Sequence, residues 1–167
     1  MVMIKTEAEQ KIVRMLYEQN AWWVTGAVSP DLSKPFKRRD FHILKNKLLE
    51  KEITAIIGPR QVGKTTLLYQ LIENLLQEKK VNPKRVLYAS FDYPYLSMLS
   101  ETPINDIFEV YSMQILREPM QKLKERIYIF FDEICKLEKW SSILKGWYDL
   151  KYQIKFIISA SSSTDFL

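Results

Sequence analysis

The 167-residue sequence has little cysteine, histidine or glycine, and it has no long hydrophobic run. Its single cysteine, Cys135, has no partner for a disulfide within the chain, as is usual in a reducing compartment. The single histidine, His42, stands between Phe41 and Ile43, which favours packing over metal binding. No apolar run approaches the ~18 residues of a membrane-spanning helix, and the first residues lack a signal-peptide pattern. We therefore expect a cytoplasmic protein without membrane contact.

The charge is moderately positive and unevenly distributed. The formal net charge is +5, and 47% hydrophobic against 27% charged residues is typical of a globular domain. Basic residues gather ahead of the first expected strand: Lys34, Lys37, Arg38, Arg39, Lys45, Lys47 and Lys51. Such a stretch attracts nucleic acid or acidic surfaces, whereas a solvated helix face is the simpler explanation. No zinc spacing or aromatic-interleaved motif accompanies it, so we favour the solvated face and keep a nucleic-acid partner as an alternative.

Four short apolar runs have the pattern of buried parallel strands. They span residues 53–57, 86–91, 127–131 and 154–158. Nearly every residue in them is apolar, as expected for strands covered by helices on both faces. Leucines at helical spacing follow the first run, Thr102 and Pro103 begin another helical stretch, and Trp140 and Trp147 lie on a third. This alternation predicts one open α/β sheet with right-handed crossovers.

The N-terminal part is expected to precede the main domain. An amphipathic helix is predicted over 6–19, a long connection over 20–35, and a second helix over 40–51. We therefore divide the chain into an N-terminal helix with its connecting segment, residues 1–39, and a core, residues 40–167.

A glycine-containing segment directly follows the first expected strand and matches the Walker A pattern G-x-x-x-x-G-K-[ST]. Gly58 and Gly63 permit backbone angles that turn amides inward around an anion. Lys64 would reach the β- and γ-phosphates, and the Thr65 hydroxyl would ligate Mg²⁺. A lysine at a helix start opposes the helix dipole, and bound phosphate removes this conflict, which an ordinary strand–helix turn leaves unexplained. The residues assigned to ATP binding are Gly58, Pro59, Arg60, Gln61, Val62, Gly63, Lys64, Thr65 and Thr66.

Two adjacent carboxylates, Asp132 and Glu133, end the third expected strand in a Walker B pattern. Asp132 would hold Mg²⁺ directly or through water, while Glu133 would polarise the water that attacks the γ-phosphate. Acids commonly follow strands, but here the pair lies downstream of a Walker A segment. We therefore assign Glu133 and Lys64 as catalytic and Thr65 and Asp132 as metal ligands. No N-K-x-D guanine-reading motif is present, so ATP is expected rather than GTP.

Small hydroxyl residues, Ser159-Ala-Ser-Ser-Ser163, follow the fourth expected strand. They could contact the γ-phosphate or the attacking water, and a polar turn that ends the strand explains any one of them equally well.

Together these segments resemble an archaeal and bacterial branch of the AAA superfamily of P-loop ATPases. The motifs that carry the resemblance are G-P-R-Q-V-G-K-T-T at 58–66, F-D-E-I at 131–134, W-x4-K-x2-Y-D at 140–149 and I-I-S-A-S-S-S at 157–163. The resemblance implies a three-layer P-loop NTPase core with a mainly parallel sheet in the order 1-4-3-2, flanked by helices. It also makes Ser159 or Ser161 the sensor-1 residue. Cys135 and Ser159-Ala160 depart from the glutamine and Thr-Gly usual in that family.

The resemblance further implies a fifth strand, a helical lid and often a C-terminal domain, which this sequence lacks. The AAA domain would then be incomplete. Arginines that stabilise the transition state would lie there, and no arginine follows Arg126. We therefore expect slow hydrolysis, or binding without useful turnover, from this chain alone. The apolar edge strand over 53–57 would need a cover, from residues 22–28, from a second copy of the chain, or from a missing C-terminal segment.

Three functions are compatible with these observations. The favoured one is an AAA-type module that hydrolyses ATP with Mg²⁺ to move a partner or an attached domain. A small-molecule kinase is disfavoured by the adjacent Asp132 and Glu133, since a glutamate there suits attack by water. A non-enzymatic, nucleotide-dependent binding module, possibly associated with DNA, is the alternative.

Overall fold

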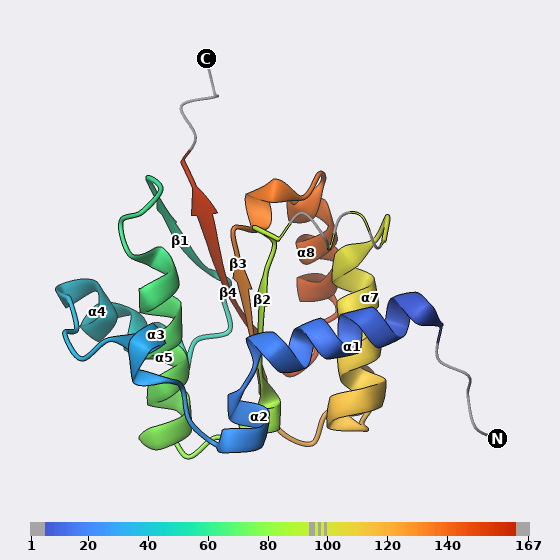
Figure 1. Ribbon diagram of the computed structural model, residues 1–167, viewed down its shortest axis with the longest axis horizontal. Helices are drawn as coiled ribbons and strands as arrows, with labels where there is room; N and C mark the ends of the chain where they lie inside the picture. Colours follow the sequence, from blue (N-terminus) through green and yellow to red (C-terminus); the bar gives the residue numbers. More distant parts are fainter. Residues whose placement is uncertain (1–5, 94–95, 97, 99, 163–167) are drawn as a thin grey trace.

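The computed structural model describes residues 6–93, 96, 98 and 100–162 of the chain. A four-stranded sheet separates two layers of helices (Figure 1). Its strands are β1 (Thr54–Gly58), β2 (Val86–Ser90), β3 (Ile127–Asp132) and β4 (Ile154–Ser161). The strand order is β1-β4-β3-β2, and all three pairings are parallel. The predicted α/β fold and its strand order are therefore confirmed.

The helices lie on both faces of the sheet (Figure 1). One layer holds α3 (Pro30–Ser33), α4 (Arg39–Lys47) and α5 (Lys64–Gln77), and the other holds α1 (Glu7–Gln19), α7 (Pro103–Val110) and α8 (Trp140–Asp149). The described residues also form shorter helical segments: α2 (Trp22–Thr25), η1 (Pro83–Arg85), η2 (Tyr111–Leu116), η3 (Met120–Lys122) and η4 (Ile134–Lys136). The helix predicted over 40–51 ends earlier, at Lys47. No helix in these described residues is long and apolar enough to cross a bilayer.

The core lies between the sheet and its two helical layers. The apolar stripe of α5, with Leu68, Leu71 and Leu75 fully buried, covers one face. On the other face, Phe108 of α7 packs against Phe131 with ring centroids 5.8 Å apart. Burying a side chain of this size stabilises the fold by about 1.5–3 kcal/mol. The leucines at helical spacing after the first strand therefore form the buried face of α5, as the sequence predicts.

Helix α1 begins with a capping box. The Thr6 hydroxyl accepts from the Glu9 amide, and the Glu9 carboxylate accepts from the Thr6 amide. Its buried stripe, Ile12, Met15 and Leu16, follows the helical period, and the helix packs against β2 and α7. The N-terminal helix thus lies at the β2 edge of the sheet.

Side chains that follow α1 satisfy the outward backbone groups of β2. Asn20 is fully buried; its Oδ1 accepts from the Tyr88 amide at 2.7 Å and its Nδ2 donates to the Tyr88 carbonyl at 2.8 Å. The indole N–H groups of Trp22 and Trp23 both donate to the Val86 carbonyl, at 3.0 and 2.8 Å. These side chains occupy hydrogen-bonding positions that a further strand would otherwise take.

The opposite edge, formed by β1, is not covered in this way. Ala55 and Ile57 are exposed, and Ile57 retains 70% of its accessible surface. Among the described residues, no side chain caps the backbone of residues 54–57. The expectation that residues 22–28 cover this strand is wrong, because Trp22 and Trp23 are buried at β2, three strands away. An apolar pair in a connection predicts burial, but it does not say at which edge.

Candidate functional site

The predicted phosphate-binding segment lies between β1 and α5. Gln61 and Gly63 adopt positive φ angles of 59° and 93°, so the chain reverses sharply before the helix. Gly63 is the N-cap of α5, and no side chain caps this helix start. The first N–H groups of a helix have no acceptor within the helix. The loop is exposed from Pro59 to Gly63, so these amides and the positive end of the helix dipole are available to an anion.

Lys64 lies at the mouth of this loop and is only 6% exposed. Its ammonium donates to the carbonyls of Gly58 at 3.0 Å and Pro59 at 2.7 Å, and to Ser161 Oγ at 3.2 Å. Glu133 Oε1 lies 3.5 Å from the same nitrogen. The charge is therefore held inside the site by acceptors from the loop, β4 and the end of β3.

The Asp132 carboxylate is almost fully buried and accepts from three hydroxyl groups. Thr65 Oγ1 and the Tyr88 hydroxyl each donate to Oδ2 at 2.7 Å, and Ser159 Oγ donates to Oδ1. Burial raises the pKa of Tyr88, and the negative charge of Asp132 raises it further, so the phenol stays protonated and donates. The structure thus brings together Thr65 and Asp132, the two residues assigned as metal ligands.

Two oxygen ligands are too few for a metal ion that is bound by protein side chains alone, but they are enough for a magnesium ion. Among the described residues, no group of three or more His, Cys, Asp or Glu side chains could form a metal site. Mg²⁺ usually takes one or two protein oxygens and completes its shell with water and substrate phosphates. A hydroxyl and a carboxylate 2.7 Å apart, beside a phosphate-binding loop, match that requirement.

Glu133 has a left-handed backbone, with φ 52°, which is uncommon for a residue with a side chain. Its amide donates to Ser159 Oγ at 2.9 Å, which holds the turn. The carboxylate accepts from Ser161 Oγ at 2.7 Å and from the Ser161 amide at 3.2 Å. This conformation directs Glu133 toward Lys64 and β4, while the preceding Asp132 faces Thr65.

The two serines proposed for sensor 1 have different positions. Both belong to β4, which runs on to Ser161, so they do not follow the strand as predicted. Ser159 is fully buried and supports Asp132 and the Glu133 amide. Ser161 contacts Lys64 and Glu133 directly. Ser163, the last serine of the predicted turn, lies outside the described residues.

Arg38 contacts the loop from the N-terminal segment. Its Nη1 donates to the Val62 carbonyl at 2.8 Å, and its guanidinium lies beside Gly63. In a trans peptide the carbonyl and the next N–H point in opposite directions. Holding the Val62 carbonyl toward Arg38 therefore turns the Gly63 amide the other way. A cavity of about 370 Å³ adjoins this contact, and the largely exposed ring of Phe36 lies on its wall.

Tyr88 and Arg38 are the site residues that sequence reasoning missed. Tyr88 stands inside an apolar run and carries no motif, so nothing in the sequence marks its hydroxyl. Arg38 appeared only as one of seven basic residues ahead of the first strand.

Comparisons with known proteins identify the family to which this chain is similar. A family model described as an AAA domain matches residues 50–167. An uncharacterized protein of Haemophilus influenzae is 29% identical over 97 residues, which cover 56% of this chain and 22% of that protein. An uncharacterized protein of Methanocaldococcus jannaschii is 26% identical over 124 residues, which cover 74% of this chain and 24% of that protein. The chain thus spans less than a quarter of either relative.

The solved structure of C. elegans PCH-2 is similar to this chain. The similarity covers 96% of this chain and 42% of the PCH-2 chain, with 14% sequence identity and a TM-score of 0.46.

Proposed function

The chain belongs to the AAA domain family, a family of ATP-binding modules, and from that premise we propose that it hydrolyses ATP to ADP and phosphate with Mg²⁺. One observation supports the proposal most strongly. Lys64, Thr65, Asp132 and Glu133 converge from the phosphate loop and the end of β3, although 66 or more residues separate the two pairs in the sequence.

We propose that the loop amides and Lys64 bind the β- and γ-phosphates. Lys64 would exchange its contacts with the Gly58 and Pro59 carbonyls for phosphate oxygens, which are stronger acceptors because they are charged. Arg38 would keep the Gly63 amide turned toward the phosphates. Mg²⁺, when bound by Thr65 and Asp132, neutralises charge on the β- and γ-phosphates.

Glu133 is the proposed general base, since its carboxylate shares Ser161 and Lys64 with the phosphate site. It would accept a proton from the water that attacks the γ-phosphate. Ser161 would fix the positions of the Glu133 carboxylate and the Lys64 ammonium relative to each other. We therefore assign the sensor-1 role to Ser161 rather than to Ser159. Ser159 would act through Asp132 by fixing the position of that carboxylate.

Turnover is proposed to be slow in this chain. Arg38 is bound to the Val62 carbonyl, Arg60 belongs to the loop itself, and the last arginine, Arg126, precedes β3 and therefore lies at the end of the sheet opposite Asp132. An arginine at the transferred phosphate contributes about 10³–10⁵ in rate. We propose that a second copy of the chain or a further domain supplies that charge.

Calorimetry and phosphate release test the proposal. Wild-type chain should bind Mg–ATP with saturable heat, and Lys64→Ala should abolish that heat. Glu133→Gln should bind normally and lose phosphate release. Lys139→Ala, which removes an exposed lysine outside the loop, is the matched control for Lys64 and should behave as wild type. Absence of saturable heat in the wild type, or unchanged phosphate release in Glu133→Gln, would contradict the proposal.

A nucleotide-dependent binding module without turnover, associated with DNA through residues 34–51, is the alternative. Three of these basic side chains make contacts within the chain: Lys37 forms an ion pair with Glu73, Lys47 forms one with Glu50, and Arg38 donates to the Val62 carbonyl of the loop. DNA affinity that falls steeply with salt and rises when nucleotide is bound, without phosphate release, would favour this alternative.

A further inference from the structure

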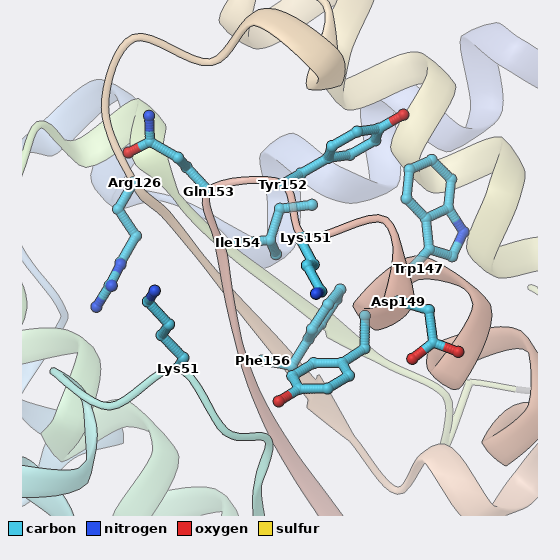
Figure 2. Close-up of a pocket in the computed structure, with 10 residues that line it drawn as sticks. Lys51, Arg126, Trp147, Asp149, Lys151, Tyr152, Gln153, Ile154 and Phe156 are labelled. Carbon is cyan, nitrogen blue, oxygen red and sulfur yellow. The ribbon is translucent and has the colours of Figure 1, made fainter.

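A second cavity, of about 570 Å³, lies at the amino ends of β3 and β4, whereas the proposed phosphate loop lies at the carboxyl end of β1. Figure 2 shows the residues that line it. Its walls come from the end of α8, the turn into β4, and the residues just before β1 and β3. No residue of this cavity belongs to the nucleotide site described above. Its volume falls within the roughly 300–1,000 Å³ of small-molecule sites.

Three cationic side chains line this cavity: Lys51, Arg126 and Lys151. In the close-up, Arg126 and Lys51 lie on one side of the cavity (Figure 2). Arg126 Nη1 donates to the Leu49 carbonyl at 2.9 Å, which fixes the guanidinium and leaves its other N–H groups available. In the part of the chain that the structure describes, none of the three forms an ion pair with a carboxylate.

The acidic residue in the described lining, Asp149, is already engaged. Asp149 forms an ion pair with Lys145 one helical turn earlier in α8. The cavity therefore presents a surplus of positive charge.

An aromatic wall faces the cations. Trp147 and Tyr152 lie on the other side of the cavity from Arg126 in the close-up (Figure 2), with ring centroids 6.3 Å apart. Trp147 is fixed by its indole N–H, which donates to Asn105 at 2.9 Å, and by an edge contact with Phe108 at 4.5 Å. Both rings are only half-buried, so each retains surface for a flat partner.

We propose that this cavity binds a small organic anion in which a phosphate or carboxylate is attached to a flat ring. The anionic group would meet Arg126 and Lys51, because a guanidinium and an ammonium bind both kinds of oxyanion. The ring would pack against Trp147 and Tyr152. This site is independent of the nucleotide site, since it lies at the other end of the sheet and shares no residue with it.

Nuclear magnetic resonance of the ¹⁵N-labelled chain tests the proposal through the indole N–H of Trp147, assigned with Trp147→Phe. The probes are phenyl phosphate, benzoate, inorganic phosphate and phenol. Phenyl phosphate or benzoate should shift this resonance saturably, and the tighter of the two identifies the anionic group. Inorganic phosphate carries only the anionic group and phenol only the ring, so each should bind at least about tenfold more weakly.

Variants separate this site from general charge effects. Arg126→Gln and Lys51→Gln should each weaken binding by about tenfold, and exposed Lys51 keeps the test valid should Arg126→Gln impair folding. Lys139→Gln, at the opposite end of α8, is the matched control and should change nothing. Lys64→Ala should leave the Trp147 shift intact, whatever it does to nucleotide binding.

Three results would overturn the proposal. They are the absence of a saturable shift with both aromatic anions, equal weakening by Lys139→Gln, and loss of the shift in Lys64→Ala. Failure of the chain to bind Mg–ATP would contradict the proposed function and leave this result unaffected.

Discussion

The two edges of the sheet differ in how their backbone groups are satisfied. At the β2 edge, side chains of Asn20, Trp22 and Trp23 bind the outward groups of Val86 and Tyr88. At the β1 edge, Ala55 and Ile57 face solvent. Both edges border the proposed nucleotide site, since β2 supplies Tyr88 and β1 leads into the loop proposed to bind phosphate.

This difference shows that one N-terminal segment can secure the two sides of a site by different means. Toward β2 it uses buried, paired hydrogen bonds, which keep a strand fixed because unmaking them leaves buried groups unsatisfied. Toward the loop that follows β1, the segment uses an exposed contact from Arg38 to the Val62 carbonyl. We therefore expect changes at the β2 edge to alter stability, and changes near the β1 edge to alter binding.

The largest effect is expected for Asn20→Leu. The substitution leaves the buried Tyr88 N–H and carbonyl without partners, so unfolding should become easier by about 4 kcal/mol. Chemical denaturation measures this. Asn46→Ala is the matched control, because Asn46 makes only an exposed bond at 3.5 Å and should cost little. A loss equal to that of the control would show that Asn20 does not secure β2.

Next is the pair Trp22→Phe and Trp23→Phe. Each indole donates to the same Val86 carbonyl, so either one alone keeps it satisfied. Single variants should lose about 1 kcal/mol of stability each, and the double variant about 3 kcal/mol, more than the sum. A double-mutant cycle by denaturation measures the coupling. If the stability losses of the two single variants add up to that of the double variant, the shared Val86 carbonyl does not couple the two indoles.

Arg38→Gln should weaken Mg–ATP binding by about tenfold, or about 1.4 kcal/mol, because the Gly63 amide is then no longer held in place. The melting temperature should stay within a degree or two of the wild type, since the contact is exposed. Titration calorimetry beside a thermal melt checks both. Arg39→Gln, the exposed neighbour, should leave the affinity unchanged.

Ile57→Lys should have the smallest effect on stability. Because Ile57 is 70% exposed, the free energy of unfolding should change by less than about 0.5 kcal/mol. If a second copy covers this edge, the charge should also reduce self-association, which sedimentation at several concentrations measures. A large loss of stability would show that β1 is covered in the isolated chain.

Much of the fold follows from sequence pattern. Continuous apolar runs between helical stripes predict buried parallel strands, and the glycine-lysine segment predicts the loop between β1 and α5, because both depend on local preferences. The resemblance supplied the strand order, which the structure confirms.

The rest depends on contacts between distant residues. Nothing local says that Asn20 meets Tyr88, 68 residues away, or that Trp22 lies at β2 rather than β1. The extension of β4 to Ser161 was also missed, because small hydroxyl residues are typical of turns. Here they continue the strand, because residues 159–161 pair with residues 56–58 of β1.

Tyr88 connects the end of the N-terminal helix to Asp132, one of the two proposed magnesium ligands. The main-chain N–H and carbonyl of Tyr88 are hydrogen-bonded to Asn20, which directly follows α1, and the Tyr88 hydroxyl donates to the Asp132 carboxylate. We therefore expect the position of α1 and the position of the Asp132 carboxylate to be coupled through one aromatic side chain.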